Sequence, residues 1–450
     1  QCPNCGDPHW VKTQLQQPVS LQYSGTKIAN DGGSRATSAN DTVKSLQHLV
    51  SPITGVITNL MELPAPITSA IKIYRTGFFR TPPSYKAINQ SDFVQISLGK
   101  GIDVVQSQAS ALCETIERFA AQYQGDECWQ YVAPSELDAR YYTPSELVQF
   151  SEEQFQYFSK KHQTIEDTKF ATQRYELDTP LNWVPTWSVT NQARVYIPFN
   201  YGFANTPFEA DDQFICWNSN GCAAGNTLEE AILQGFFELI ERDATAIWWY
   251  NKIETQAINL NGLPKQHAQK FEEALQDWHY WVLNITNDLD IPVMAGVAQH
   301  KDTGKFCLGF GCHLNATIAC QRALAELCQL IPIRDQNGAS FDFNAIQVEA
   351  FLMPQGKPRA LDSFAKLETP YIKEDILWCV KKFEVHHLEI LVLNYCRPNL
   401  PIKTVKVIIP GLCHIWPQLG AQRLYSVPLK MGWLTEPKTE VTLNPLALCI

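Results

Sequence analysis

Two segments of the chain carry apolar residues at the spacing of a long α-helix. They cover residues 104–124 and 227–250, and they predict the two best-defined helices of the protein. Thr227 stands at the start of the second segment and Glu230 follows three residues later, which is the capping-box pattern of a helix N-terminus. We therefore expect this helix to begin at about Thr227.

Short runs rich in β-branched and aromatic residues lie between and after these helices. They predict strands over 194–199, 291–298, 305–311, 389–394 and 404–409. Weaker helical periodicity predicts two more helices, over 316–331 and 373–385. Because helical and strand patterns are mixed along the chain, we expect an α/β (mixed α+β) fold with helices packed on β-sheets. The patterns do not determine the strand order.

The first 43 residues differ from the rest in being polar and poor in apolar periodicity. We expect residues 1–43 to form a linker or extended arm and residues 44–450 to form one domain. Cys2 and Cys5 form a CxxC pair, which supplies half of the ligands of a tetrahedral Zn²⁺ site. The chain contains no second CxxC, so either the other pair comes from outside it or the knuckle is a loose terminal turn. We favour the first alternative and expect the chain to be part of a longer protein.

Composition and charge exclude several classes of protein. The chain is 45% hydrophobic and 18% charged, which is enough apolar material for a large core, and its net charge is −10. No run of Lys and Arg could neutralise a row of phosphates, so we expect no nucleic-acid partner. No stretch of about 18 apolar residues exists, so we expect no membrane span. The 14 cysteines are scattered through apolar segments, which favours a cytoplasmic location.

The two strongest helices share the sequence pattern E-x-I-E-R-x-A. The first copy contains Glu114 and Glu117, and the second contains Glu238 and Glu241. Residues three positions apart are neighbours on one helix face, so the two carboxylates of each pair repel each other unless a cation lies nearby. Two copies on two helices therefore predict a shared cation site.

Two interpretations of the carboxylate pairs are open. They could be solvated helix faces supported by neighbouring arginines, which is the usual role of such a pattern. The apolar residues that flank both pairs instead favour partial burial, and buried carboxylates need a cation. Ser110 lies four residues before Glu114 and Glu230 lies eight residues before Glu238, so each lies on the same helix face as the carboxylate pair of its helix. Because Glu stands where iron carboxylate proteins have His, the ligand set favours Mg²⁺, which commonly arrives with nucleotide phosphates.

Small residues precede both helices. Residues 218–227 read Asn-Ser-Asn-Gly-Cys-Ala-Ala-Gly-Asn-Thr and predict a loop that leads into a helix N-terminus, where N–H groups and the helix dipole favour an anion. Gly99-Lys100-Gly101 is a shorter version of this arrangement, without the Walker A spacing. Such loops also serve as plain turns, so phosphate binding is one of two interpretations.

The order and spacing of these motifs resemble those of the YcaO family. The motifs that carry the likeness are Ser51-Pro-Ile-Thr-Gly55, Gly99-Lys-Gly, Ser110-x-x-x-Glu114-x-x-Glu117-Arg118, the run 219–231, Glu238-Leu-Ile-Glu241-Arg242, Arg322-Ala-Leu-x-Glu326-x-x-Gln329, Val407-Ile-Ile-Pro-Gly411 and Gly420-x-x-Arg423. The likeness covers roughly residues 44–450 and is strongest to the cyanobactin heterocyclases, which are cyclodehydratases. It implies a YcaO-type fold around an ATP site. It also implies that a leader-binding domain and the second zinc pair are supplied by an N-terminal region missing here.

The resemblance also implies which residues form the nucleotide site. Five glutamates would hold Mg²⁺ and the triphosphate: Glu114, Glu117, Glu230, Glu238 and Glu241. The other residues implied to contact the nucleotide are Lys44, Ser51, Ser110, Asn226, Arg242 and Arg322. No residue is identified as a catalytic base.

The activity implied by the resemblance is ATP-dependent cyclodehydration of a ribosomal precursor peptide. A substrate Cys, or Ser or Thr, would attack the preceding amide carbonyl, and phosphorylation of the resulting oxygen would let it leave and form an azoline. This order makes chemical sense because amide oxygen is a poor leaving group until it is phosphorylated. Two alternatives stay open: another amide-activating reaction such as thioamide formation, and a catalytically silent scaffold that binds a peptide.

Two features of the C-terminal half bear on these expectations. Azoline-forming members of the family usually end in a proline-rich tail, whereas residues 443–450 of this chain contain only Pro445. This departure leaves the identity of the reaction open. The aromatic run 248–250 could pack in the core or against a second copy, so a homodimer is a further alternative.

Overall fold

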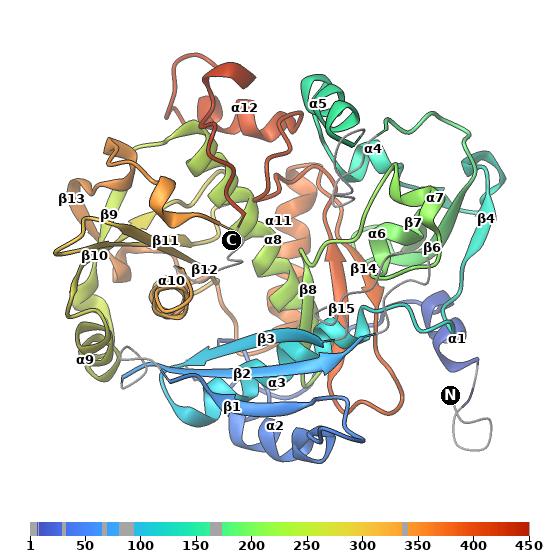
Figure 1. Cartoon of the computed structure of the whole chain (residues 1–450), viewed down its shortest axis with the longest axis horizontal. Coiled ribbons are helices and arrows are strands. Elements are labelled where there is room, and N and C mark those ends of the chain that lie inside the picture. Colours follow the sequence, from blue (N-terminus) through green and yellow to red (C-terminus); the bar gives the residue numbers. More distant parts are fainter. Residues whose placement is uncertain are drawn as a thin grey trace.

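The fold is built from three β-sheets arranged around one long central helix (Figure 1). The computed structural model describes residues 7, 9–28, 33–64, 70–80, 94–162, 173–334 and 341–449. The predicted zinc pair, Cys2 and Cys5, lies outside these residues.

Each sheet has its own strand order. The three-stranded sheet has the order β1-β2-β3, with β1 at Asn59–Glu62, β2 at Lys72–Phe79 and β3 at Val94–Gly101. The five-stranded sheet has the order β12-β11-β10-β9-β13, with β9 at Gln256–Asn259, β10 at Trp278–Asn284, β11 at Val293–His300, β12 at Phe306–Cys312 and β13 at Gln355–Ala360. The seven-stranded sheet runs β5-β7-β6-β14-β15-β8 with β4 paired to β6; its strands are β4 Gln130–Val132, β5 Arg140–Tyr141, β6 Leu181–Ser188, β7 Ala193–Pro198, β8 Cys222–Gly225, β14 Leu391–Asn394 and β15 Lys403–Ile408.

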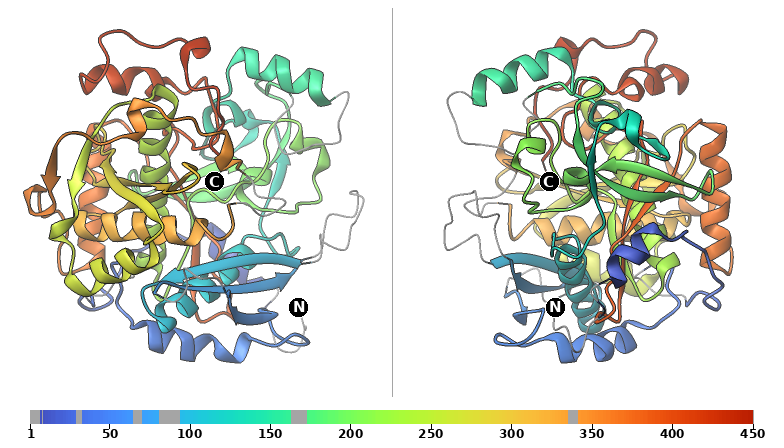
Figure 2. Two further views of the ribbon diagram at one scale, coloured as in Figure 1. Left: turned by 60° about the vertical axis from the view of Figure 1, so that its left-hand side comes forward. Right: turned by 90° about the vertical axis from the view of Figure 1, so that its right-hand side faces the viewer.

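The helices cover these sheets and fill the space between them. Their bounds are α1 Trp10–Gln16, α2 Ala39–Leu46, α3 Val104–Ala120, α4 Pro144–Leu147, α5 Glu152–His162, α6 Phe199–Gly202, α7 Glu209–Asp212, α8 Leu228–Asn251, α9 Lys265–Ala274, α10 Ala316–Leu330, α11 Ile372–Val385 and α12 Gln422–Lys430. Helix α8 packs against β8 and β15 of one sheet and against β11 and β12 of another, so it joins the two larger sheets. Both views in Figure 2 show α2 and the β1–β3 sheet at the end opposite α12. None of the helices described is long and apolar enough to cross a bilayer.

The four predicted helices are confirmed as α3, α8, α10 and α11, with ends shifted by at most a few residues. Thr227 is the N-cap of α8, because its hydroxyl accepts a hydrogen bond from the N–H of Glu230 at 3.2 Å. In a capping box the Glu230 carboxylate would accept from the N–H of the N-cap residue, Thr227. Here it accepts at 2.8 Å from the N–H of Asn226, the residue before the N-cap. The helix start is therefore as predicted, and the Glu230 carboxylate is directed back to the residue that precedes Thr227.

The five predicted strands are confirmed as β7, β11, β12, β14 and β15. Two predictions of loops are wrong in part. Residues 222–225 form β8, which pairs with β15 from Cys222–Lys406 to Gly225–Lys403, and Gly99-Lys100-Gly101 is the end of β3. Small residues are needed there for close packing against helices rather than for a turn, and local spacing does not distinguish the two.

The N-terminal segment that was predicted as a linker packs against the body of the protein. It contains α1, and Val11, Leu15 and Val19 are at most 6% exposed. These apolar residues recur every four positions, but the run is too short to predict a helix from periodicity alone. The core therefore already includes residues that precede Lys44.

The aromatic run at the C-terminal end of α8 belongs to the core of this chain. Trp248, Trp249 and Tyr250 are each at most 2% exposed. The indole N–H of Trp249 donates to the carbonyl of Leu446 at 2.7 Å, so the last described residues pack along this end of α8. Core packing of the run is thus confirmed, whereas a second copy of the chain stays a prediction.

A substitution at Gly99 tests how closely α3 approaches β3. A Cβ atom at this position would lie 2.1 Å from the backbone nitrogen of Ala111. We expect Gly99→Ala to push the helix off the sheet and to lower the free energy of unfolding by roughly 1–3 kcal/mol in denaturant titration. The control is Gln95→Ala on the same strand, which should change it by no more than about 0.5 kcal/mol. Equal stability of the two variants would contradict the close approach.

Candidate nucleotide and magnesium site

A cavity of about 530 Å³ lies where α3, α8 and α10 meet β3, β8 and the N-terminal arm. Most of the residues predicted to contact the nucleotide line it: Ser110, Glu114, Glu117, Asn226, Glu230, Glu238, Glu241, Arg242 and Arg322. The two helices that carry the repeated motif thus direct their carboxylates into one space. This placement of both motifs is the central feature of the site.

Lys44 and Ser51 are not brought to the cavity lining in this structure. Lys44 is exposed on α2, although Thr42 of the same helix lines the cavity. The hydroxyl of Ser51 accepts hydrogen bonds at 3.3 Å from the N–H groups of Ile53 and Thr54. Ser51 therefore closes its own turn, and nucleotide contacts from Lys44 and Ser51 stay predictions.

The carboxylates of the cavity are largely removed from solvent. The side chains of Glu117 and Glu238 are 13% and 23% exposed, so they do not form the solvated helix faces that were the alternative interpretation. Burial raises the pKa of Glu114, Glu117 and Glu238. Burial and the neighbouring Glu326 raise the pKa of Glu241 to about 7. The cavity thus holds more negative charge than its surroundings stabilise, and a cation would relieve this.

Two arginines within the motifs offset part of this charge. Arg118 Nη1 lies 3.6 Å from Glu117 Oε1, and Arg118 Nη2 lies 3.8 Å from Glu114 Oε1. On the second helix, Arg242 Nη2 lies 3.8 Å from Glu238 Oε1. At these separations the ion pairs are looser than direct hydrogen bonds, so the carboxylate oxygens can still coordinate a ligand.

Glu230 and Asn226 are held in place by the N-terminal arm. One oxygen of the Glu230 carboxylate accepts from the N–H of Ala36 at 2.6 Å, and the other accepts from the N–H and the side-chain amide of Asn226 at 2.8 and 3.2 Å. The amide oxygen of Asn226 accepts from the hydroxyl of Thr42 at 3.0 Å. Residues far apart in the sequence therefore preorganise the first turn of α8.

The donor groups of the cavity fit a polyphosphate. Lys100, Arg35, Arg242 and Arg322 contribute positive charge to its walls. The side-chain Nε2 of Gln234 is shielded from solvent and finds no hydrogen-bond acceptor within the described parts of the chain. Phosphate oxygens would provide acceptors for such donors.

The carboxylates fit a hard metal ion. Oxygen ligands from α3 and α8 together with phosphate oxygens form the ligand set that Mg²⁺ prefers. Across the residues that the structure describes, no three His, Cys, Asp or Glu side chains are already clustered as a metal site. Both components of a metal–triphosphate complex thus find matching groups in the cavity.

Several lining residues were missed by the assignment from the sequence. Glu326 and Gln329 follow Arg322 at helical spacing on α10, so the same stripe argument could have found them. Lys100 Nζ lies 3.7 Å from Glu326 Oε1, which links β3 to α10 across the cavity. Arg35 lies in the arm, where no periodic pattern marks it, and only the tertiary structure reveals it.

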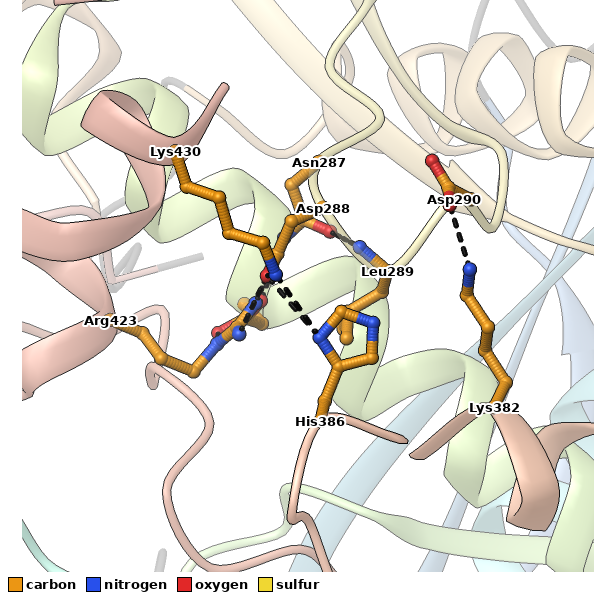
Figure 3. A network of polar contacts seen from close by, with 9 residues as sticks. Asn287, Asp288, Leu289, Asp290, Lys382, His386, Arg423 and Lys430 are labelled. Atoms are coloured by element: carbon orange, nitrogen blue, oxygen red, sulfur yellow. Dashed lines mark hydrogen bonds and ion pairs between the residues drawn. The ribbon is translucent and has the colours of Figure 1, made fainter. Parts of the chain in front are cut away.

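A cluster of ionic contacts around Asp288 and Arg423 also holds α8 (Figure 3). Asp243, fully buried, accepts from Arg423 Nη2 at 2.7 Å and from the N–H of Cys413 at 2.8 Å. Arg423 Nη2 also donates to Asp288 at 2.8 Å, and Lys430 Nζ lies 3.0 Å from the same carboxylate. The cluster ties α8 to α12 at Asp243, the residue that follows Glu241 and Arg242 in the helix.

Comparison with known proteins assigns the chain to a family. A family model described as a YcaO cyclodehydratase that binds ATP and Mg²⁺ matches residues 98–413. The chain belongs to the YcaO family. An uncharacterised protein of Methanothermobacter thermautotrophicus is 25% identical to this YcaO protein over 409 residues, which cover 84% of this chain and 94% of that protein.

Solved structures show the same fold. A heterocyclase in complex with substrate and cofactor superimposes with a TM-score of 0.91 at 34% identity, covering 100% of this YcaO protein and 61% of that chain. The heterocyclase TruD gives a TM-score of 0.77 at 30% identity, with 99% and 57% covered. The YcaO protein of Methanopyrus kandleri bound with AMPPCP and Mg²⁺ gives 0.65 at 19% identity, with 86% and 94% covered. The chain thus spans about three fifths of the two heterocyclases and nearly all of the third chain.

The raised pKa of Glu241 predicts a pH dependence of stability. Between about pH 4.5 and pH 7 the native state keeps a proton that the unfolded chain releases, so the free energy of unfolding should fall as pH rises through this range. In metal-free buffer, Glu241→Gln should remove this contribution and stabilise the protein above about pH 7 by roughly 1–3 kcal/mol. Urea titrations on both sides of the range measure it. The exposed Glu254→Gln is the control, and identical pH slopes for wild type and Glu241→Gln would contradict the assignment.

Removal of Arg423 should destabilise the protein strongly. Arg423→Ala leaves the fully buried Asp243 without its main cation, which we expect to cost about 3–5 kcal/mol of unfolding free energy. The control is Lys382→Ala, because Lys382 pairs with Asp290, whose side chain is 71% exposed, and such pairs contribute about 1 kcal/mol or less (Figure 3). Thermal and urea denaturation of both variants check the difference, and equal losses would be inconsistent with the cluster's role.

Proposed function

We propose that this YcaO protein is the catalytic part of an ATP- and Mg²⁺-dependent peptide heterocyclase. The observation that carries the proposal is the convergence of Glu114 and Glu117 from α3 with Glu230, Glu238 and Glu241 from α8 on one cavity. The family assignment and the two heterocyclase structures support the same class of reaction. The proposed substrate is a ribosomal precursor peptide in the cytoplasm.

The proposed reaction closes a ring and consumes one ATP. The thiolate of a substrate Cys forms a C–S bond to the preceding carbonyl carbon, and the carbonyl π electrons move to oxygen. This oxygen then takes the γ-phosphoryl group as the bond to the β–γ bridging oxygen breaks and ADP leaves. Finally the C–O bond breaks, the amide nitrogen loses its proton to form C=N, and inorganic phosphate departs. The products are thiazoline, ADP and phosphate, and Ser or Thr would give oxazolines by the same steps.

Some residues of the cavity would stabilise charge during this reaction, and others hold the groups of the site in position. Mg²⁺, when bound by the glutamates, would neutralise phosphate charge during phosphoryl transfer. Arg242 and Arg322 carry positive charge on the same walls and would stabilise charge on the transferring group and on ADP. The hydrogen bonds of Ala36 and Asn226 hold Glu230 in its orientation before the nucleotide binds. Leader recognition by a further part of the protein and a zinc site at Cys2 and Cys5 stay predictions of the resemblance.

The proposal predicts the effect of neutralising the carboxylates. With ATP, Mg²⁺ and a cysteine-containing precursor peptide, the wild type should release phosphate and remove the mass of one water from the peptide per cyclised residue. Glu114→Gln and Glu241→Gln should each lower the rate of phosphate release by roughly 100-fold or more, because a ligand of the metal–phosphate complex is lost. Phosphate assay and mass spectrometry of the peptide measure both effects.

The same experiment separates the alternatives. Glu254→Gln, an exposed position just beyond α8, is the control and should keep full activity. Replacement of oxygen by sulfur in the peptide, in the presence of a sulfide donor, would show thioamide formation instead of cyclisation. A wild-type protein that binds the peptide without releasing phosphate would refute the proposal and support a silent scaffold.

A further inference from the structure

One part of the cavity wall is apolar, and nothing in the nucleotide site uses it. Its side chains are Ile96 and Leu98 of β3, Phe310 of β12, Leu330 of α10 and Ile333, which follows that helix. Ile96 is 50% exposed, and Leu98, Leu330 and Ile333 are only partly buried, so the core of the protein does not cover them. Metal ions and phosphates gain little from apolar walls, so this part of the cavity calls for a different ligand.

Two contacts between β3 and α10 show where these side chains lie. Lys100 Nζ is 3.7 Å from Glu326 Oε1, and the side-chain amide of Gln329 donates to the carbonyl of Leu98 at 3.2 Å. The strand therefore runs back from Lys100 as the helix runs forward from Glu326. Ile96, the next residue on the same side of β3, lies level with the C-terminal end of α10.

The N-terminal arm marks the opposite end of the cavity. A Cβ atom at Gly33 would lie 3.7 Å from Arg322 Nη1, so the arm meets the first half of α10. Leu330 follows Arg322 by eight residues, which is roughly 12 Å along the helix axis. Glu326 lies between them and is close enough to Glu241 to raise its pKa. The apolar end of the cavity thus adjoins the predicted metal site on the side away from the arm.

Strand β3 has a free edge beside this apolar wall. It is the last strand of the three-stranded sheet (Figure 1). Gly77 is the partner of Ile96 on β2, and its carbonyl accepts from the N–H of Thr58 at 2.8 Å. The backbone polar groups of Gly77 therefore face away from β3, and those of Ile96 face the free edge. Neither the N–H nor the C=O of Ile96 has a hydrogen-bond partner among the residues that the structure describes, and an extended chain laid beside β3 would pair with them.

The residue after Ile96 adds a side-chain group. Ser97 is 2% exposed and lines the cavity. Its hydroxyl finds no hydrogen-bond partner within the described ranges of the chain. A buried hydroxyl without a partner is costly, so this stretch of β3 offers a ligand a hydrogen bond from a side chain as well as from the backbone.

We propose that an extended segment of the substrate peptide lies along the free edge of β3, with the apolar neighbours of its reacting residue packed against Ile96, Leu98 and Ile333. The inference rests on the proposed function, in which the peptide carbonyl must reach the γ-phosphate inside this cavity. Pairing with the backbone of β3 gives affinity for any extended peptide, whereas the apolar walls select the residues next to the reacting one. The competing occupants of the wall are the adenine ring of the nucleotide and a second copy of this chain.

Binding of a labelled peptide to the full chain tests this contact without turnover. The probe is a fluorescein-labelled peptide with one cysteine between leucines, and its anisotropy is measured with Mg²⁺ and a non-hydrolysable ATP analogue. Ile96→Ser should raise the Kd of the peptide by roughly 5–20-fold, because apolar area buried by the peptide is lost, and should change MgATP affinity by less than about 2-fold. Ile333→Ser, on the facing wall, should have the same effect.

The matched control is Met61→Ser. Met61 lies on β1 of the same sheet and is 51% exposed, as against 50% for Ile96, but it is not among the described residues that line the cavity. This variant should keep the wild-type Kd. A peptide with aspartates in place of the leucines should bind the wild type at least about 10-fold more weakly, and Ile96→Ser should narrow that difference.

The peptide backbone provides a separate test of the pairing with β3. Only every second N–H of an extended peptide faces a neighbouring strand. Two peptides that are N-methylated at alternate positions, one at the even and one at the odd residues, should therefore differ in Kd by at least about 5-fold. Equal Kd values would contradict the pairing.

Three further results would overturn the inference. The first is a wild type that does not bind the peptide, or an unchanged Kd in Ile96→Ser or Ile333→Ser. The second is an equal loss of peptide and MgATP affinity, which would assign the wall to the adenine ring. The third is conversion of a dimer into a monomer by Ile96→Ser in sedimentation, which would assign it to a second copy. A wild type that binds the peptide as expected but releases no phosphate would instead contradict the proposed function, so the two failures are distinguishable.

Discussion

The burial of acidic side chains from two helices around one cavity is the constraint on which the rest of the structure depends. Glu114 and Glu117 on α3 and Glu238 and Glu241 on α8 are partly buried, and burial raises the pKa of each of them. The protein keeps these groups together although they repel one another, and its own arginines offset the charge only in part. Such an arrangement stores unfavourable energy in the free protein, which a metal ion and its phosphate ligand can release on binding.

The surroundings of α8 keep this arrangement from relaxing. On one side, the buried pair of Asp243 and Arg423 fixes the helix to α12. On the other side, the arm fixes its first turn through Ala36 and Glu230. A helix held at both faces cannot rotate to expose its carboxylates, so the cavity stays preorganised for the nucleotide.

The chain belongs to the YcaO family, whose model is described as binding ATP and Mg²⁺. The architecture explains how the residues of such a site are brought together. The cavity lies between elements from all three sheets and the arm, so residues from segments scattered along the chain must meet before a nucleotide can bind. The N-terminal arm is therefore part of the site rather than a passive connection.

The sequence by itself determined the four helices α3, α8, α10 and α11, the five confirmed strands and the spacing of the carboxylates on α3 and α8. These features follow from the positions of residues within one or two turns, and a helix converts such spacing directly into a common face. It also determined the family, because the motifs occur in a fixed order. Glu326 on α10 obeys the same rule, although it was not assigned to the site.

Only the tertiary structure decided which faces meet. The hydrogen bond from Ala36 to Glu230 joins residues 194 positions apart, and no local pattern records it. The same holds for the position of Arg35 beside Arg322. It also holds for Gly99, which looks like a turn residue in the sequence alone, because only the partner helix α3 shows that it is needed for close contact between β3 and α3. Residue spacing specifies each surface, whereas the pairing of surfaces depends on how the whole apolar core packs.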